Sequence, residues 1–278
     1  MYIDAHCHLN DDALYPDYDA HAANFVKAWG VGIVTVWCDL DSSTRACEIA
    51  KNLVVGRSLW DSRFASLEQA KATIGIHPSE ACFGAVTMDN IDSVLAGIEA
   101  LYQHEKDVVC AIGECGIDMH YEWSVAALDV QQELFRRQCA WAREEKLPVV
   151  VHSRDGFEQT VAVMKLYSDA VYYIHCFGYG PDEIKKLLEE FPHIYFGFDG
   201  NISYPKAQAL RDACVLVPSD RLILETDAPY LAPQWLRGTT NVPANVQQIY
   251  AYVANLRGVD ESMMCKEIAA NAAKLYAW

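Results

Sequence analysis

The feature that most constrains the fold is an alternation of short apolar runs with helical stretches, which repeats about eight times along the chain. The apolar runs begin at Tyr2, Val31, Ala72, Val108, Leu147, Val171, Ile194 and Arg221. Strands that alternate with helices indicate parallel βαβ units, and near-continuous apolar strands suit a sheet that is buried on both faces. About eight such units favour a closed (β/α)8 TIM barrel over an open doubly wound sheet, which would need a glycine-rich phosphate loop that the sequence lacks.

The segments between these runs carry helical periodicity, with apolar residues at i, i+3, i+4 and i+7 across 130–146. Further helices are predicted at 182–191 and, at the end of the chain, at 262–278. No low-complexity segment or Pro/Gly-rich linker divides the chain, so residues 1–278 are expected to form a single domain.

The balance of charge limits the kinds of partner that we expect. The chain has 38 Asp and Glu residues against 22 Lys and Arg residues, with a formal net charge of −16. This argues against the broad basic face that clamps long nucleic acid by counterion release. The sequence contains no signal-peptide pattern, no apolar stretch of membrane-spanning length and, among ten cysteines, no Cys-x-x-Cys pair. We therefore expect a cytoplasmic protein with free thiols and no membrane partner.

Two histidines, His6 and His8, lie one residue apart near the start of the chain, behind Asp4. In an extended strand residues i and i+2 point the same way, so the two imidazoles share a face and Asp4 shares it one step deeper. Neutral imidazole is a common metal ligand, and a shared cation would suit this pair. The pair alone is a weak signal, because two solvated histidines on a surface strand would give the same pattern.

Other metal-capable side chains stand at the ends of the predicted strands. The set comprises His6, His8, His77, Glu114, His152, His175 and Asp227. The carboxyl ends of barrel strands meet at one mouth, where active sites form. An ionised carboxylate inside an apolar strand is costly unless it is paired or metal-bound, so Glu114 and Asp227 strengthen the prediction of a metal centre. The other four histidines are interpreted as surface residues, although His120 closely follows the strand that carries Glu114.

Six longer segments occur in order, almost from end to end of the chain. They are DAHCHL from Asp4, GIHP from Gly75, GECGID from Gly113, VHSRD from Val151, HCFG from His175 and LETDAPYLAP from Leu224. With these segments, the NVP at Asn241 and the ending NAAKLY, the sequence resembles the TatD family of metal-dependent hydrolases, often described as metal-dependent deoxyribonucleases. The resemblance implies a TIM barrel of the metallo-dependent hydrolase type.

The resemblance also implies a centre with two divalent metal ions. His6 and His8 would bind one ion with Asp227, His152 and His175 would bind the second, and Glu114 would bridge the two. Imidazole and carboxylate ligands suit Zn, Mn or Co, and Mg stays possible. A third ion near Glu114 is left open.

Three positions depart from the pattern of the family. Asn10 stands where an acid is common, Gly178 where Ser is usual, and Val242 where Glu is frequent. None of the three is an expected ligand. We expect all three to line the mouth and to bear on the choice of substrate.

Other residues receive supporting roles. Two cations roughly 3.5–4 Å apart can clamp a phosphodiester and activate a water molecule, which Asp227 could orient or deprotonate. His77 would donate to a phosphate oxygen or to that water, or else play a structural role at the rim. The planar fork of Arg154 suits a phosphate contact, with a rim salt bridge as the alternative. Glu225 and Asp4, one layer deeper, could fix the tautomers of the ligands.

The leading hypothesis is an exonucleolytic deoxyribonuclease acting on single-stranded DNA or duplex ends. The same scaffold and metals would serve an amide or ester hydrolase, such as an aminoacyl-tRNA deacylase. A non-catalytic metal-binding scaffold is less favoured, because such a protein has no need to keep Glu114 and Asp227. The sequence leaves the oligomeric state open, and a monomer is compatible with it.

Overall fold

The strands form one parallel sheet that curls into a nearly closed barrel, as predicted. The computed structural model describes residues 1–36, 38–58 and 62–278, and in this part of the chain the sheet has eight strands in sequence order. The strands are β1 (Tyr2–Cys7), β2 (Gly30–Thr35), β3 (Gln69–Ile74), β4 (Val109–Asp118), β5 (Val149–Arg154), β6 (Tyr172–Ile174), β7 (Ile194–Phe198) and β8 (Leu222–Leu224). The segment after β8 returns to β1, where the Asp227 amide donates to the His6 carbonyl at 3.0 Å.

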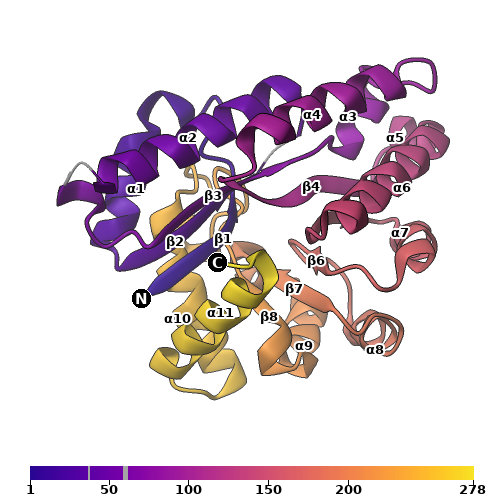
Figure 1. Ribbon diagram of the computed structural model, residues 1–278. Helices are drawn as coiled ribbons and strands as arrows, with labels where there is room; N and C mark the ends of the chain where they lie inside the picture. Colours follow the sequence, from indigo (N-terminus) through magenta and orange to yellow (C-terminus); the bar gives the residue numbers. More distant parts are fainter. Residues whose placement is uncertain (37, 59–61) are drawn as a thin grey trace.

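Helices surround the barrel on the outside (Figure 1). They are α1 (Tyr18–Lys27), α2 (Leu40–Ser58), α3 (Pro78–Cys82), α4 (Ile91–Glu105), α5 (Glu122–Ala126), α6 (Leu128–Glu145), α7 (Phe157–Met164), α8 (Pro181–Glu190), α9 (Gln208–Leu216), α10 (Val246–Arg257) and α11 (Glu261–Tyr276). Among the described residues, no helix is both long enough and apolar enough to cross a bilayer.

Alternation along the strands divides the core into two layers. In β6, Tyr172 and Ile174 pack between the sheet and the helices, whereas Tyr173 packs inside the barrel. In β8, Leu222 faces outward in the same way and Ile223 faces inward. Both faces of the sheet are therefore buried, which explains why the strands are nearly continuous apolar runs.

The last helix closes the amino-terminal end of the barrel. Tyr276 of α11 is buried in the inner layer, and its hydroxyl donates to the Ala5 carbonyl at 2.9 Å. The helix ends at Tyr276, before the predicted end at residue 278, because Ala277 adopts a left-handed conformation with φ of 53°. The predicted strand run beginning at Val31 also ends early, since β2 stops at Thr35, and Trp37 of that run lies outside the described residues.

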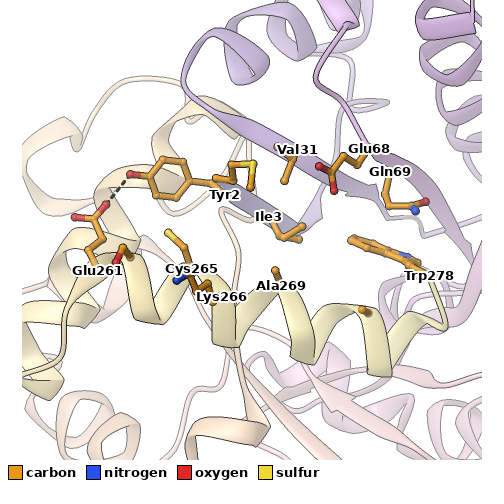
Figure 2. A pocket seen from close by; sticks show the side chains of 13 residues that line it. Tyr2, Ile3, Val31, Glu68, Gln69, Glu261, Cys265, Lys266, Ala269 and Trp278 are labelled. Carbon is orange, nitrogen blue, oxygen red and sulfur yellow. Dashed lines mark hydrogen bonds between the residues drawn. The ribbon is translucent and has the colours of Figure 1, made fainter.

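A cavity of about 650 Å³ lies at this amino-terminal end. Figure 2 shows the Trp278 indole close to Ile3, with Tyr2 farther along the cavity. The Tyr2 hydroxyl donates to Glu261 at 2.6 Å. None of the site residues expected from the sequence lines this cavity, whereas most of them line a second cavity, which is described below.

Candidate metal centre

Glu114 is placed by a bulge in β4. The sequence predicts Glu114 at the end of its strand, but β4 continues to Asp118, so Glu114 lies within the strand. The register of β4 against β5 shifts between Ile112 and Cys115, and Gly116 has φ of 148°. A bulge re-aims a side chain within a strand, which explains how a buried mid-strand carboxylate reaches the mouth of the barrel.

The Glu114 carboxylate lies at the centre of a ring of histidines. Its Oε1 atom is 2.7 Å from His175 Nε2, 2.9 Å from His152 Nδ1 and 3.3 Å from His77 Nε2. Its Oε2 atom faces the other side, 3.4 Å from His6 Nε2. The two oxygens thus face two different groups of imidazoles, which is the arrangement that a bridging carboxylate needs.

Asp227 completes the side of the cluster that β1 forms. Its Oδ1 atom lies 3.2 Å from His8 Nε2 and 3.5 Å from His6 Nε2. The His8 Nδ1–H group donates to the Val36 carbonyl at 3.1 Å. That bond orients the His8 ring so that its Nε2 atom is hydrogen-bonded to Asp227, and a cation bound here would take the place of the proton on that Nε2 atom.

The donor atoms suit divalent cations. Three sets of side chains have donor atoms within 4.8 Å of one another: His6, His175 and Asp227; His6, His8 and Glu114; and His77, Glu114 and His152. The Nε2 atoms of His6 and His8 are 3.3 Å apart, close enough for both to bind one cation. All six expected ligands therefore converge, and their roles as ligands stay a prediction. His77, expected in a supporting role, lies in the same cluster.

Electrostatic interactions within the cluster favour, in three residues, the deprotonated state that binds a metal ion. Burial, followed by the nearby His175, lowers the pKa of His6 to about 3. Burial acts against ionisation of Glu114, but the surrounding histidines hold the pKa of its carboxyl well below the usual range. Burial acts against ionisation of Asp227 too, but the hydrogen bond and charge of His8, together with the charges of His175 and His6, lower the pKa of its carboxyl. The two carboxylates are therefore ionised and His6 is neutral.

The pKa of His152 is raised, in contrast to that of His6. Burial acts against its protonation, but Asp118 and Glu114 on either side raise its pKa to about 9. Its Nδ1 atom lies near Glu114 and its Nε2 atom is 3.4 Å from Asp118 Oδ2. A cation bound beside Glu114 would take the place of one of these protons, because a metal binds imidazole in its deprotonated form.

The acids below the cluster support the backbone rather than the ligands. Asp4 accepts from the Thr226 amide at 2.9 Å and from the Thr226 hydroxyl at 2.6 Å. Glu225 accepts from the Cys176 amide and the Tyr173 hydroxyl. The expected role in fixing ligand tautomers is not seen, since His175 Nδ1 lies 3.9 Å from Glu225, beyond hydrogen-bonding distance.

The cluster opens into a cleft of about 790 Å³, which His77 and His152 line together with rim residues. Arg154 lies at the rim with its guanidinium over the Tyr121 ring, 5.7 Å from the ring centroid. In the described part of the chain no carboxylate is at ion-pair distance from Arg154, so the alternative of a rim salt bridge is not seen. On the rim Tyr230 donates its hydroxyl to Asp11 at 2.7 Å.

Two expectations about the mouth were wrong. Asn10 is fully buried, where it donates to the Val36 carbonyl and accepts from the Thr35 hydroxyl. Val242 packs against the core outside the cleft. Of the three positions that depart from the family pattern, only Gly178 lines the cleft.

Sequence reasoning also missed some residues of the cleft. His120, interpreted as a surface residue, is exposed but lines the cleft, with its Nδ1 atom 2.6 Å from Asp155 Oδ2. Lys206 and Cys38 line it as well. The only available signal was that His120 closely follows the strand of Glu114, since Lys206 and Cys38 belong to no motif.

Known proteins resemble this chain over most of its length. The profile of the family described as TatD related DNase matches residues 3–277. The uncharacterized metal-dependent hydrolase YabD of Bacillus subtilis is 32% identical over 279 residues, covering 99% of each chain. The 3'-5' ssDNA/RNA exonuclease TatD of Pantoea ananatis is 32% identical over 248 residues, covering 84% of this chain and 91% of the relative.

A solved structure supports the fold. The TatD homolog YJJV from Escherichia coli superposes with a TM-score of 0.85, covering 100% of this chain and 98% of its own. The two sequences are 22% identical, so this likeness concerns the architecture of the barrel.

Proposed function

This chain belongs to the TatD family of metal-dependent hydrolases, and on that premise we propose that it is a two-metal deoxyribonuclease that cleaves DNA from an end. The observation that carries the proposal is the position of Glu114 between two groups of imidazoles at the floor of an open cleft. A relative named as an exonuclease of single-stranded DNA and RNA supports the choice of bond and the exonucleolytic mode.

We assign the ligands by the side of Glu114 on which they lie. His6 and His8 would hold one ion with Asp227, and His152 and His175 would hold the second, with Glu114 between them. When bound there, divalent cations would act as Lewis acids that polarise a phosphodiester and acidify a coordinated water molecule.

The side chains of the cleft then have distinct tasks. The ionised Asp227 can orient the attacking water and accept its proton. His77, 3.3 Å from Glu114, is near enough to the cluster to hold a phosphate oxygen. Arg154 at the rim presents its planar donors to the next phosphate along the strand.

The proposal is compatible with the acidic charge of the whole molecule. Two divalent ions against the two carboxylates Glu114 and Asp227 leave a locally positive centre despite the net charge of −16. Such a centre attracts one phosphate at a time and suits strand ends rather than long duplex.

All ten cysteines are free thiols, which supports action in a reducing compartment such as the cytoplasm.

Hydrolysis of end-labelled DNA tests the proposal. Single- and double-stranded substrates carrying a 5′ or a 3′ label would be incubated with Mn, Mg or Zn. We expect stepwise shortening by the wild type and loss of about a thousandfold or more in Glu114→Ala and Asp227→Ala. Glu158→Ala, which removes an exposed carboxylate paired with Lys186, is the matched control and should retain activity.

A failure would be informative. If metal analysis finds the protein loaded and no labelled DNA is shortened, the nuclease proposal is wrong. Ester and amide substrates, including aminoacyl-tRNA, would then be tested on the same metal-loaded protein.

A further inference from the structure

Three aromatic side chains form a stacked row on the surface beside the cleft. The ring centroids of Tyr121 and Trp123 are 4.6 Å apart with their planes at 11°, and those of Trp123 and Phe83 are 5.0 Å apart at 28°. All three are exposed: Phe83 by 73%, Tyr121 by 44% and Trp123 by 43%. We call Phe83, Trp123 and Tyr121 the aromatic column.

The two ends of the column differ. At one end the Arg154 guanidinium covers Tyr121, and Arg154 also lines the cleft over the metal cluster. At the other end Phe83 stacks on Trp123 with one face, and its large exposed fraction leaves the other face open to solvent. The column therefore leads outward from the rim of the cleft and ends in an unoccupied aromatic face.

Buried hydrogen bonds hold the elements that carry the column. Phe83 follows α3, and Tyr121 and Trp123 lie at the start of α5. The amide of Gln131, a fully buried residue of α6, donates to the Asp118 carbonyl at 3.0 Å and to the Ser124 carbonyl at 2.8 Å. The same amide nitrogen lies 3.3 Å from the sulfur of Cys82, the last residue of α3. The buried Gln131 side chain therefore fixes the position of the elements that carry the column.

Charge argues for stacking as the means of holding a strand outside the cleft. The net charge of −16 argues against broad binding of phosphates outside the proposed metal centre. Bases stack on aromatic rings without regard to sequence, and this contribution does not depend on neutralising phosphates. Paired bases in a duplex are covered by their neighbours, so the open face of Phe83 suits an unpaired base.

We propose that the aromatic column is a base-stacking site for the single-stranded part of a nucleic-acid substrate, whose unpaired base extends the column at Phe83. The proposal rests on the function proposed above for the cleft. Arg154 connects the two, because it lies over Tyr121 and also lines the cleft that holds the metal cluster. An apolar protein segment is the competing occupant, and it offers no reason for the column to begin at the cleft.

Binding without hydrolysis tests the column directly. Fluorescence anisotropy would measure the affinity of a labelled single-stranded dodecanucleotide in the presence of a chelator. We expect Phe83→Ala and Trp123→Ala to weaken binding about tenfold, Phe83→Trp to restore it, and an abasic strand to show no difference among the variants. The control is Trp29→Ala, because Trp29 is 72% exposed and directly precedes β2 at the other end of the barrel.

Hydrolysis separates this inference from the function on which it rests. In the presence of Mn, Phe83→Ala should raise KM about tenfold for the dodecanucleotide and leave KM for a dinucleotide unchanged, with kcat unaffected for both. Equal affinity of wild type and Phe83→Ala for the dodecanucleotide would overturn the inference even if the enzyme cleaves DNA. Weaker binding by Phe83→Ala would uphold the column even if no DNA is cleaved.

Discussion

At the scale of single residues, Glu225 shows how a buried carboxyl can support the candidate metal centre without being one of its proposed ligands. It is fully buried and accepts hydrogen bonds from the Tyr173 hydroxyl and the Cys176 amide. Burial, with the charges of Asp227 and Asp4 nearby, raises its pKa well above the usual range. Glu225 is therefore a neutral acceptor that fixes the backbone next to His175.

Two substitutions of Glu225 show whether its hydrogen bonds or a negative charge on its carboxyl group stabilise the fold. Glu225→Leu should lower the free energy of unfolding by about 2–4 kcal/mol, because the Tyr173 hydroxyl and the Cys176 amide lose their buried acceptor. Glu225→Gln keeps one oxygen that accepts from the Cys176 amide and places an NH2 group that can donate to the Tyr173 hydroxyl oxygen, so it should cost less than about 1 kcal/mol. Urea unfolding of both variants measures the difference. A Gln variant as unstable as the Leu variant would mean that the carboxylate acts as a charge.

The convergence of the candidate ligands could be predicted because their chemistry is unusual at their positions. A carboxylate such as Glu114 within an apolar strand has few explanations besides a metal or a partner. Asn10 could not be placed in this way, since an amide suits a buried hydrogen bond as well as an exposed mouth. The aromatic column was missed because Phe83 and Trp123 meet only through the packing of α3 and α5.

At the scale of elements, the bulge in β4 is the feature that sequence periodicity could not predict. The apolar run from Val108 predicts the strand but not the register shift that turns Glu114 toward the mouth. The shifted stretch between Ile112 and Cys115 contains Gly113, which adopts φ of 137°, and Gly116 follows it with φ of 148°. A Cβ atom at Gly116 would lie 2.0 Å from the His152 carbonyl oxygen, so only glycine allows β4 to pass β5 this closely.

Substitution of this glycine should therefore damage both stability and the site. Gly116→Ala should lower the free energy of unfolding by about 2–4 kcal/mol, because the backbone of β5 must move and the backbone of β4 is strained. It should also reduce the metal content, since His152 lies on β5 and Glu114 on β4. Gly238 offers a matched control: it has φ of 93° and nothing within 4 Å of an added Cβ atom.

Gly238→Ala should cost about 1 kcal/mol or less through backbone strain alone and should leave the metal content unchanged. Urea unfolding and elemental analysis of the two variants provide the comparison. If both variants lose the same stability and keep full metal content, the close approach of β4 to β5 does not shape the site.

At the scale of the whole molecule, the proposed metal centre would join the two ends of the barrel sheet. His6 and His8 come from the first strand of the chain, and Asp227 follows the last. The protein alone makes this junction with few bonds, among them the one from the Asp227 amide to the His6 carbonyl. The alternation of strands and helices predicts a barrel, but it does not show that the ligands lie across the closing edge.

Ions bound by both edges should hold the barrel closed. An ion that binds only the folded chain stabilises it by about 2.7 kcal/mol when its concentration is a hundred times Kd. For a chain of this size, each kcal/mol shifts the melting temperature by about 2–4 °C. Removing the metal with a chelator should therefore lower the melting temperature of the wild type by about 5 °C or more, and added Mn should restore it.

The variant that lacks the bridging carboxylate separates loss of metal from other effects of the chelator. Glu114→Ala should show a much smaller difference in melting temperature with and without the chelator, because both ions lose the ligand that they share. The exposed-site control Glu158→Ala should behave like the wild type, since Glu158 is paired with Lys186 on the surface. If the metal-loaded wild type melts at one temperature in both conditions, the ions do not hold the closing edge, and β1 and the segment after β8 meet through protein contacts alone.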